Sequence, residues 1–464
     1  MKKIFTAIII LTLVLIAFAG CKGGVRGGNP APPGVKAEPV ELFTYMYDAE
    51  NEGIRLTEYS GSKRKVKIPD EIESSPIVGI SADCFEAGTV TEVYLPATVK
   101  YFKWGGKKSA NFKKAKKIVI PNGVTTIVEE TFWDCSALTS VTIPDSVTAI
   151  GKDAFYNCRS LKSVTIPAGV RIIGEGVFTC CSALTSIVIP NGVTNIEYST
   201  FYSCSSLTSV TIPGSVTNIS ARAFEGCASL VSVTIPDRVI AINNNAFNGC
   251  SALTSVTIPN TVTDIGCSAF MNCSSLKSVT IPDSVTIIGM STFSYCSSIT
   301  SITIPDSVTM IDSYAFENCS SLTNIMIPDS VTVIGMSVFG NCSSLTSVKL
   351  PNNITGIDYG MFSMCSSLTS ITIPDSAGVI GGNVFYRCKA LTSVVIPDSV
   401  IEIRECAFYG CGSLMNLKIP DSVWSIGDSA FRGCSLLSEE TKQKIRKINR
   451  NSSYSPEYFD SIYS

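Results

Sequence analysis

A 23-residue phrase repeats through most of this chain, and it constrains the fold more than any other feature. Prolines recur every 23 residues from Pro121 to Pro420, phenylalanines from Phe132 to Phe431 and cysteines from Cys135 to Cys434, fourteen of each. The register never slips, so each repeat is one structural unit. A unit of this length is stable only when neighbouring units cover both of its faces. The sequence therefore predicts a solenoid of stacked coils.

The unit that starts at Cys273 shows the elements expected in each coil. Val279 and Ile281 alternate with polar residues, which predicts a strand, and Pro282 ends it because proline cannot donate to a β-ladder. A second short extended piece follows at residues 285–288, and the rest of the unit is long enough for one helical turn. We therefore predict an α/β repeat solenoid of the leucine-rich-repeat type, with parallel β-ladders and a short helical turn in every coil.

The repeated pattern resembles that of a known family. Written out, it is L-x-x-V-x-I-P-x-x-V-x-x-I-G-x-x-A-F-x-x-C, and over residues 66–437 it is similar to the BspA-like leucine-rich repeats of bacterial and protist surface proteins. The asparagine that follows the strand in other leucine-rich repeats is replaced by proline, which leaves the standard horseshoe curvature open. The resemblance implies adhesion to host matrix or plasma glycoproteins such as fibronectin and fibrinogen, or to other bacteria.

The N-terminal residues have the pattern of a secretion signal. Lys2 and Lys3 precede an apolar run, residues 4–19, that is too short for a stable membrane span. The run ends in AFAGC, which resembles the lipobox of bacterial lipoproteins. This resemblance implies that residues 1–20 are a lipoprotein signal peptide and that Cys21 receives the lipid. A plain cleaved signal and an uncleaved anchor are the alternatives. We expect a lipid-anchored protein of the cell envelope, exposed on the bacterial surface.

Composition and spacing divide the rest of the chain into five parts. Glycine and proline with few large apolar residues predict a tether, and an irregular spacing of the repeat residues predicts a cap. After the last repeat, a serine, two glutamates and then basic residues predict a short capping helix. The expected parts are a lipid-anchored tether at 21–39, an N-terminal cap with degenerate repeats at 40–117, regular repeats at 118–437, the helix at 438–450 and a disordered tail at 451–464.

The composition argues against an enzyme. The chain has no histidine, which excludes His-dependent triads, His general bases and His-containing metal sites. Its formal net charge of -2 gives no pull toward nucleic acid, and we predict no nucleic-acid partner. Aspartates that follow the repeat proline are interpreted as solvated turn residues, because no calcium-binding signature accompanies them. We predict no catalytic residue, no cofactor and no metal site.

The fourteen regularly spaced cysteines are interpreted as packing residues. In-register coils place them about 4.8 Å apart, and they form no C-x-x-C pairs of the kind that bind zinc. We therefore expect buried free thiols that act as small hydrophobic residues. Besides Cys21, four cysteines lie outside this series, at Cys84, Cys180, Cys267 and Cys406, and we expect oxidation at these first.

Outward strand positions form the first candidate binding surface. They carry a long row of threonines that is interrupted near its C-terminal end. A uniform, repeated surface suits large partners that are held by many weak contacts. Threonine also fits any exposed β-ladder, whatever the function. The candidate partner-binding residues are Thr165, Thr211, Thr234, Thr257, Thr280, Thr303, Met326, Lys349, Thr372 and Lys418.

A basic segment forms the second candidate surface. Residues 100–117 contain eight lysines interleaved with aromatic residues and no acidic residue. This combination suits an anionic glycan or lipid head groups, and a solvated insertion loop is the alternative. The candidate residues are Lys100, Lys103, Trp104, Lys107, Lys108, Lys113, Lys114, Lys116 and Lys117.

Together these patterns favour a binding protein. We expect a cell-surface lipoprotein adhesin that binds large extracellular partners through its repeat surface. Two other functions stay open: a cell-envelope structural protein that associates with itself, and a surface receptor that captures glycans.

Overall fold

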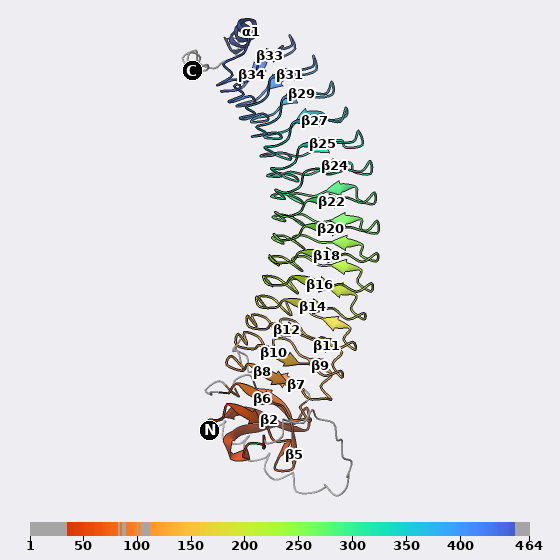
Figure 1. Ribbon diagram of the computed structural model, residues 1–464, viewed down its shortest axis with the longest axis vertical. Helices are drawn as coiled ribbons and strands as arrows, with labels where there is room; N and C mark the ends of the chain where they lie inside the picture. The colour runs from red at the N-terminus through yellow and green to blue at the C-terminus, as the bar shows by residue number, and fades with distance from the viewer. Residues whose placement is uncertain (1–34, 82–83, 86–89, 100, 104–111, 451–464) are drawn as a thin grey trace, which may run out of the picture.

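The computed structural model describes residues 35–81, 84–85, 90–99, 101–103 and 112–450, and these form one elongated stack of coils (Figure 1). The N-terminal strands lie at one end of the stack and the helix α1 (Glu439–Arg450) lies at the other. Each regular coil has three sides, which are a first strand, a second strand and a third side without strands. Within the described residues, no helix has the length and apolar character needed to cross a membrane.

The first strands stack in parallel register along the molecule. Val256 of one coil pairs with Val279 of the next, and both side chains point into the core. Thr303 continues this ladder through a single bridge to Thr280. The first strands are β3 (Lys65–Lys67), β6 (Glu92–Tyr94), β8 (Lys117–Val119), β10 (Ser140–Thr142), β12 (Ser163–Val164), β14 (Ser186–Val188), β16 (Ser209–Thr211), β18 (Ser232–Thr234), β20 (Ser255–Thr257), β22 (Ser278–Thr280), β25 (Asn324–Met326), β27 (Ser347–Lys349), β29 (Ser370–Thr372), β31 (Ser393–Val395) and β33 (Asn416–Leu417).

The second strands form another parallel series, two residues long in every regular coil. The turn between the two strands is held by its serine, as Ser307 Oγ donates a hydrogen bond of 2.7 Å to the Val285 carbonyl of the preceding coil. The second strands are β9 (Thr126–Ile127), β11 (Ala149–Ile150), β13 (Ile172–Ile173), β15 (Asn195–Ile196), β17 (Asn218–Ile219), β19 (Ala241–Ile242), β21 (Asp264–Ile265), β23 (Ile287–Ile288), β24 (Met310–Ile311), β26 (Val333–Ile334), β28 (Gly356–Ile357), β30 (Val379–Ile380), β32 (Glu402–Ile403) and β34 (Ser425–Ile426).

The two ends of the stack have their own structures. At the N-terminus, the short helix η1 (Val40–Leu42) leads into β1 (Phe43–Asp48), which pairs antiparallel with β2 (Gly53–Tyr59). From β2 the sheet continues in parallel to β5 (Ser75–Ser81) and β7 (Tyr101–Lys103), while β4 (Glu71–Ile72) pairs antiparallel with β5. At the C-terminus, the Ser438 hydroxyl accepts a hydrogen bond from the Thr441 N–H, as an N-cap residue does, and Ile445 is buried.

A column of phenylalanine rings runs through the core. From Phe155 to Phe385, neighbouring ring centroids are 5.2 to 5.8 Å apart and the ring planes lie within 11° of each other. Tyr59, Phe85 and Phe112 extend the column toward the N-terminal cap. One aromatic ring per coil therefore links every coil to both of its neighbours.

The repeat cysteines are buried free thiols, as predicted. The Cys296 Sγ–H donates to the Phe270 carbonyl of the preceding coil at 3.1 Å, and the same contact recurs from Cys158 to Cys434. Burial raises the pKa of Cys227 to about 12, so this thiol keeps its proton. Every cysteine of the described residues is free. The expectation for Cys84 is wrong, because this residue is as buried as those of the ladder.

The predicted helical turn is not confirmed, since the third side is a run of tight turns. The backbone N–H groups of Asp153, Phe155 and Asn157 donate to carbonyl groups of the next coil at 2.7 to 2.9 Å. These groups are therefore not available for bonds within a helix. Asp153 and Asn157 have positive φ values of 52° and 60°. Residues with positive φ thus alternate with residues of ordinary φ, and this alternation turns the N–H groups toward the neighbouring coil. The fold is a parallel β-solenoid with scarce helix.

Candidate binding surface

The outward side chains of the first strands form a continuous surface, called the first-strand face below. In β22, Val279 is buried while Ser278 and Thr280 point outward and are exposed. The hydroxyls of Ser278 and Thr280 make no side-chain hydrogen bond within the described part of the chain. In contrast, where a threonine stands just before a first strand its hydroxyl is usually engaged, as Thr254 Oγ1 donates to the Val231 carbonyl at 3.2 Å. Two rows of polar groups are thus presented to solvent.

The structure brings the ten predicted residues of the threonine row onto this face. All ten are exposed: Thr165, Thr211, Thr234, Thr257, Thr280, Thr303, Met326, Lys349, Thr372 and Lys418. The row is continuous where the strands pair: Thr234 lies opposite Thr257, and Thr257 lies opposite Thr280. The row already contains the exposed Val188, and after Thr303 it becomes irregular: Met326 is 70% exposed and pairs with Lys349. An exposed methionine beside a lysine is a distinct point on a surface made mostly of serine and threonine.

The N-terminal end of this face is basic. Register places Lys65 and Lys117 on either side of Glu92, and Lys65 Nζ lies 3.0 Å from Glu92 Oε1. The hydrogen bond from Lys65 is the main cause that lowers the pKa of Glu92. Backbone hydrogen bonds between coils place Arg64 and Lys116 in the row beside it. We call this surface the basic end, and its members are Arg64, Lys65, Lys67, Lys116, Lys117 and Lys162.

The predicted basic segment contributes only in part to this surface. Lys113 Nζ lies 3.4 Å from Asp134 Oδ2, and Lys114 is exposed. Lys103 belongs to β7. Lys100, Trp104, Lys107 and Lys108 lie outside the described residues, as do Cys21, the signal, most of the tether and the tail. Arg64, Lys65 and Lys67 were not among the predicted residues, although the run KRKVKIP has the same valine, isoleucine and proline spacing as a first strand.

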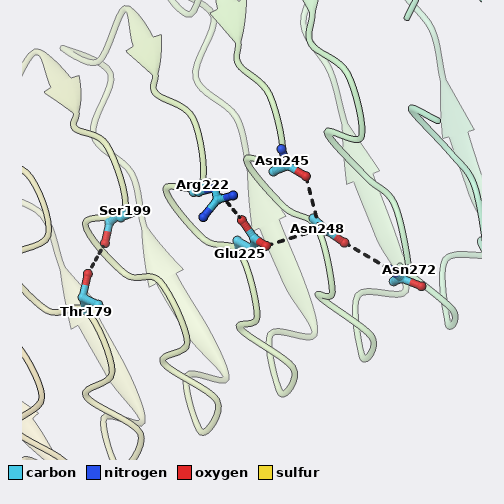
Figure 2. A network of polar contacts seen from close by, with 7 residues as sticks. All are labelled: Thr179, Ser199, Arg222, Glu225, Asn245, Asn248 and Asn272. Atoms are coloured by element: carbon cyan, nitrogen blue, oxygen red, sulfur yellow. Dashed lines mark hydrogen bonds and ion pairs between the residues drawn. The ribbon is translucent and has the colours of Figure 1, made fainter. Parts of the chain in front are cut away.

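A polar network crosses several coils on the third side (Figure 2). Asn272 Nδ2 donates to Asn248 Oδ1 at 3.2 Å, and Asn248 Nδ2 donates to Glu225 Oε1 at 3.4 Å. Arg222 Nε lies 3.4 Å from the other oxygen of this carboxylate. Burial raises the pKa of Glu225, and Arg222 and Asn248 oppose this only in part. Asn245 and Asn272 have positive φ, so the network is built on the turns that hold the coils together.

The side chains with catalytic or metal-binding chemistry are dispersed. Within residues 35–450, except the short gaps named above, the structure brings together no group of three or more aspartates, glutamates or cysteines that could hold one metal ion. Asp283, Asp306 and Asp329 follow the repeat proline in successive coils and are exposed in turns. What the coils offer is an extended surface, which is the usual binding device of solenoid proteins.

The fold and this surface define a leucine-rich repeat protein, a class of interaction scaffolds that generally bind proteins. The model of the BspA type leucine rich repeat region matches residues 105–231, 217–346, 263–392 and 378–463, which together span most of the chain. The chain belongs to the BspA-type leucine-rich repeat family. No curated protein is significantly similar to it in sequence.

Solved structures of similar proteins include leucine-rich repeat proteins of other bacteria. A leucine-rich repeat protein from Bacteroides ovatus is 28% identical, with 86% of this chain and 92% of that chain covered and a TM-score of 0.63. A leucine rich cell surface protein from Faecalibacterium prausnitzii is 25% identical, with 93% of this chain and 98% of that chain covered and a TM-score of 0.46.

Proposed function

We propose that this protein is a lipid-anchored, cell-surface adhesin that binds large extracellular proteins through the first-strand face. The observation that carries the proposal is the length of this face, which presents exposed polar side chains, most of them serine and threonine hydroxyls, in successive coils from Ser140 to Lys418. At about 4.8 Å per coil, the face extends for roughly 60 Å. A ligand of this length is a protein or a fibre, and many weak contacts would hold it. The signal pattern that ends at Cys21 supports attachment to the cell envelope.

The chemistry of the face supports specific points of recognition. Uniform serine and threonine rows offer hydrogen bonds but little distinction between partners. Met326 adds an exposed apolar side chain, and Lys349 adds a positive charge beside it. Binding energy in protein interfaces is concentrated in a few such residues. We place the centre of the interface there, with fibronectin and fibrinogen as the partners to examine first, since the BspA-like resemblance implies them.

The basic end supports a second contact with an anionic partner. Its six cations face the same side as the threonine row, and Glu92 is the acidic residue placed among them by the first-strand register. Sulfated glycans attached to matrix proteins, or lipid head groups near the anchor, have the complementary charge. Binding through the basic end would weaken as salt is raised, whereas binding at Met326 would change little.

Two matched pairs of charges test the proposal on the full-length protein. Thr257→Glu with Thr280→Glu places two carboxylates on the first-strand face, and Thr263→Glu with Thr286→Glu places two on the second-strand side of neighbouring coils. We expect the first pair to abolish binding to immobilised fibronectin or fibrinogen and the second to leave it unchanged. Equal binding by both double variants would overturn the assignment of the face.

Two further measurements separate adhesion from the alternatives. Protease treatment of intact cells should remove the protein if it is displayed outside, and its persistence until lysis would contradict surface exposure. Light scattering of the purified protein over a range of concentrations should stay flat for an adhesin. A steady rise in apparent mass would favour a self-associating envelope protein instead.

A further inference from the structure

A hollow of about 370 Å³ opens where the second strands of four neighbouring coils meet the third side. Its lining runs from Thr332 to Glu405 and combines apolar, aromatic and charged side chains. Val333 and Val379 form an apolar edge, and the exposed ring of Tyr359 stands beside them. The hollow lies on other residues than the first-strand face, so it is a separate surface of the molecule.

The hollow contains a slot that is one coil wide. Gly381 and Gly382 form its floor and are the only adjacent glycines in the regular repeats. Asp358 and Tyr359 occupy the same two positions in the coil before, and Arg404 and Glu405 occupy them in the coil after. The two walls are therefore two coil spacings apart, which is about 10 Å between backbones. These six residues are called the slot below.

A glycine widens this hollow at a position where the backbone does not require one. A Cβ built on Gly356 would meet nothing nearer than the Val379 carbonyl oxygen at 4.0 Å. Gly356 does not have a positive φ. The row of Gly356 carries Ile287 and Val333 in other coils, so a large side chain fits the fold at this position. The open space is therefore due to the glycine at this position of the sequence, since the backbone of the coil would also accept a larger residue there.

The walls of the slot offer both kinds of hydrogen-bonding group. Asp358 and Glu405 can only accept hydrogen bonds when ionised, and Arg404 can only donate them. The carboxylate of Glu405 reaches back over Gly382, so it lies at the floor. Asn383 Nδ2 donates to Tyr359 Oη at 2.8 Å, which orients the aromatic ring at the wall. A ligand that uses all of these groups must donate, accept and present a flat apolar surface.

We propose that the slot binds a sugar unit of a neutral glycan. Sugar hydroxyls both donate and accept, so they match carboxylates and a guanidinium at the same time. The apolar face of a pyranose ring packs on an aromatic ring such as that of Tyr359. The two carboxylates disfavour an anionic ligand, and Arg404, whose Nε lies 3.5 Å from Glu402 Oε1, offsets part of their negative charge. The volume lies at the small end of the range for ligand pockets, which suits one or two sugar units.

The test is saturation-transfer NMR on the purified full-length protein. The probes are glucose, galactose, mannose and N-acetylglucosamine at millimolar concentration, with Nα-acetyl-lysine amide as a cationic probe. Tyr359→Ala removes the ring, and Gly356→Ile fills the hollow with a residue that the same row already carries. We expect at least one of the four sugars to bind the wild type. Its affinity for each of the two variants should be lower by a factor of about ten or more.

A matched control separates filling the hollow from altering the ladder. Ala241→Ile adds a similar side chain in the second-strand row, in β19, far from the slot, and should leave sugar binding unchanged. Circular dichroism confirms that each variant is folded. Absence of binding by the wild type to all four sugars, unchanged binding by Gly356→Ile, or binding of the lysine amide in their place would each overturn the proposal. Loss of sugar binding with intact fibronectin binding would separate the slot from the adhesin function.

Discussion

The interior of the coils and the first-strand face follow different rules, although both are built from the same repeat. Inside, Phe155 to Phe385 are unchanged in every coil, and the rings stack almost in parallel. Outside, the row of Thr280 changes to Met326, Lys349 and Val395 without any loss of register. A buried ring is enclosed between two rings that fix its size and angle, whereas an outward side chain touches its neighbours in the row on the ladder but is open to solvent and can change size. This difference indicates that the interior rows stabilise the fold, whereas residues of the first-strand face can be substituted to change partner recognition without a large loss of stability.

The first and largest test of this comparison is to break the phenylalanine column. Phe293 is fully buried between two rings at 5.7 Å on either side. Phe293→Ala leaves a cavity and removes both ring contacts, and we expect it to lower the free energy of unfolding by about 3–5 kcal/mol. Urea denaturation followed by circular dichroism measures this. Thr280→Ala in the same coil should change it by less than about 0.5 kcal/mol, and similar losses for the two variants would remove the distinction.

A smaller effect is expected at the turns of the third side. Gly249 has a φ of +73°, so Gly249→Ala should cost about 1–2 kcal/mol from backbone strain. The control is Gly214→Ala, where φ is ordinary and an added Cβ meets nothing within 4 Å. This control should be neutral or should stabilise the protein by up to about 1 kcal/mol. If both substitutions had the same effect, positive φ would not be what holds the turns.

A pH-dependent effect should follow from the polar network. Because the folded pKa of Glu225 is raised above its usual value of 4.5, this group stabilises the fold most at low pH, and that contribution is lost as pH rises through the folded pKa. Glu225→Gln should therefore flatten the fall in stability above pH 4.5. Thermal unfolding at several pH values measures it. Glu175→Gln, at an exposed ion pair with Lys152, serves as the control and should leave the slope unchanged.

The smallest effect on stability is expected where the face is irregular. Met326→Thr with Lys349→Thr restores the common residue of the row, and we expect the free energy of unfolding to change by less than about 0.5 kcal/mol. The same double variant should lose binding to the protein partner, because it removes the exposed methionine and the adjacent lysine at which we place the centre of the interface. Surface plasmon resonance provides the measurement. Unchanged affinity together with unchanged stability would show that the regular rows carry recognition.

Much of the coil could be predicted from the spacing of residues. The inward positions of Val279 and Phe293 follow from the strand pattern and the period, and both are buried. The spacing of residues could not exclude the helical turn. The length of a segment does not determine whether its backbone N–H groups donate within the segment or to the neighbouring coil. Glycine, asparagine or aspartate at many of the positions two residues before and after the repeat phenylalanine was the available signal, since these residues tolerate positive φ. The other such positions carry serine, tyrosine, arginine and other residues, so the signal is incomplete.

The candidate sites show the same division. The threonine row could be predicted because a period of 23 residues places the same position of every coil side by side. The basic end could be predicted only in part: the run KRKVKIP has the spacing of a first strand, but Lys65 lies in a degenerate coil, and its register with Lys117 is visible only when the strands are paired. The slot could not be predicted, since Tyr359 and Glu405 face each other across Gly382 only after three coils have stacked.

The amino-acid sequence by itself determined the repeat, the inward rows, the threonine row and the family. These features depend on which residues recur. A strict period shows this directly, because residues 23 positions apart occupy the same place in successive coils. Tertiary structure alone decided the turn geometry, the register of the basic end and the slot. Each of these features depends on hydrogen bonds and side-chain contacts between coils. The residues that make these contacts do not follow the repeat, so the period does not predict them.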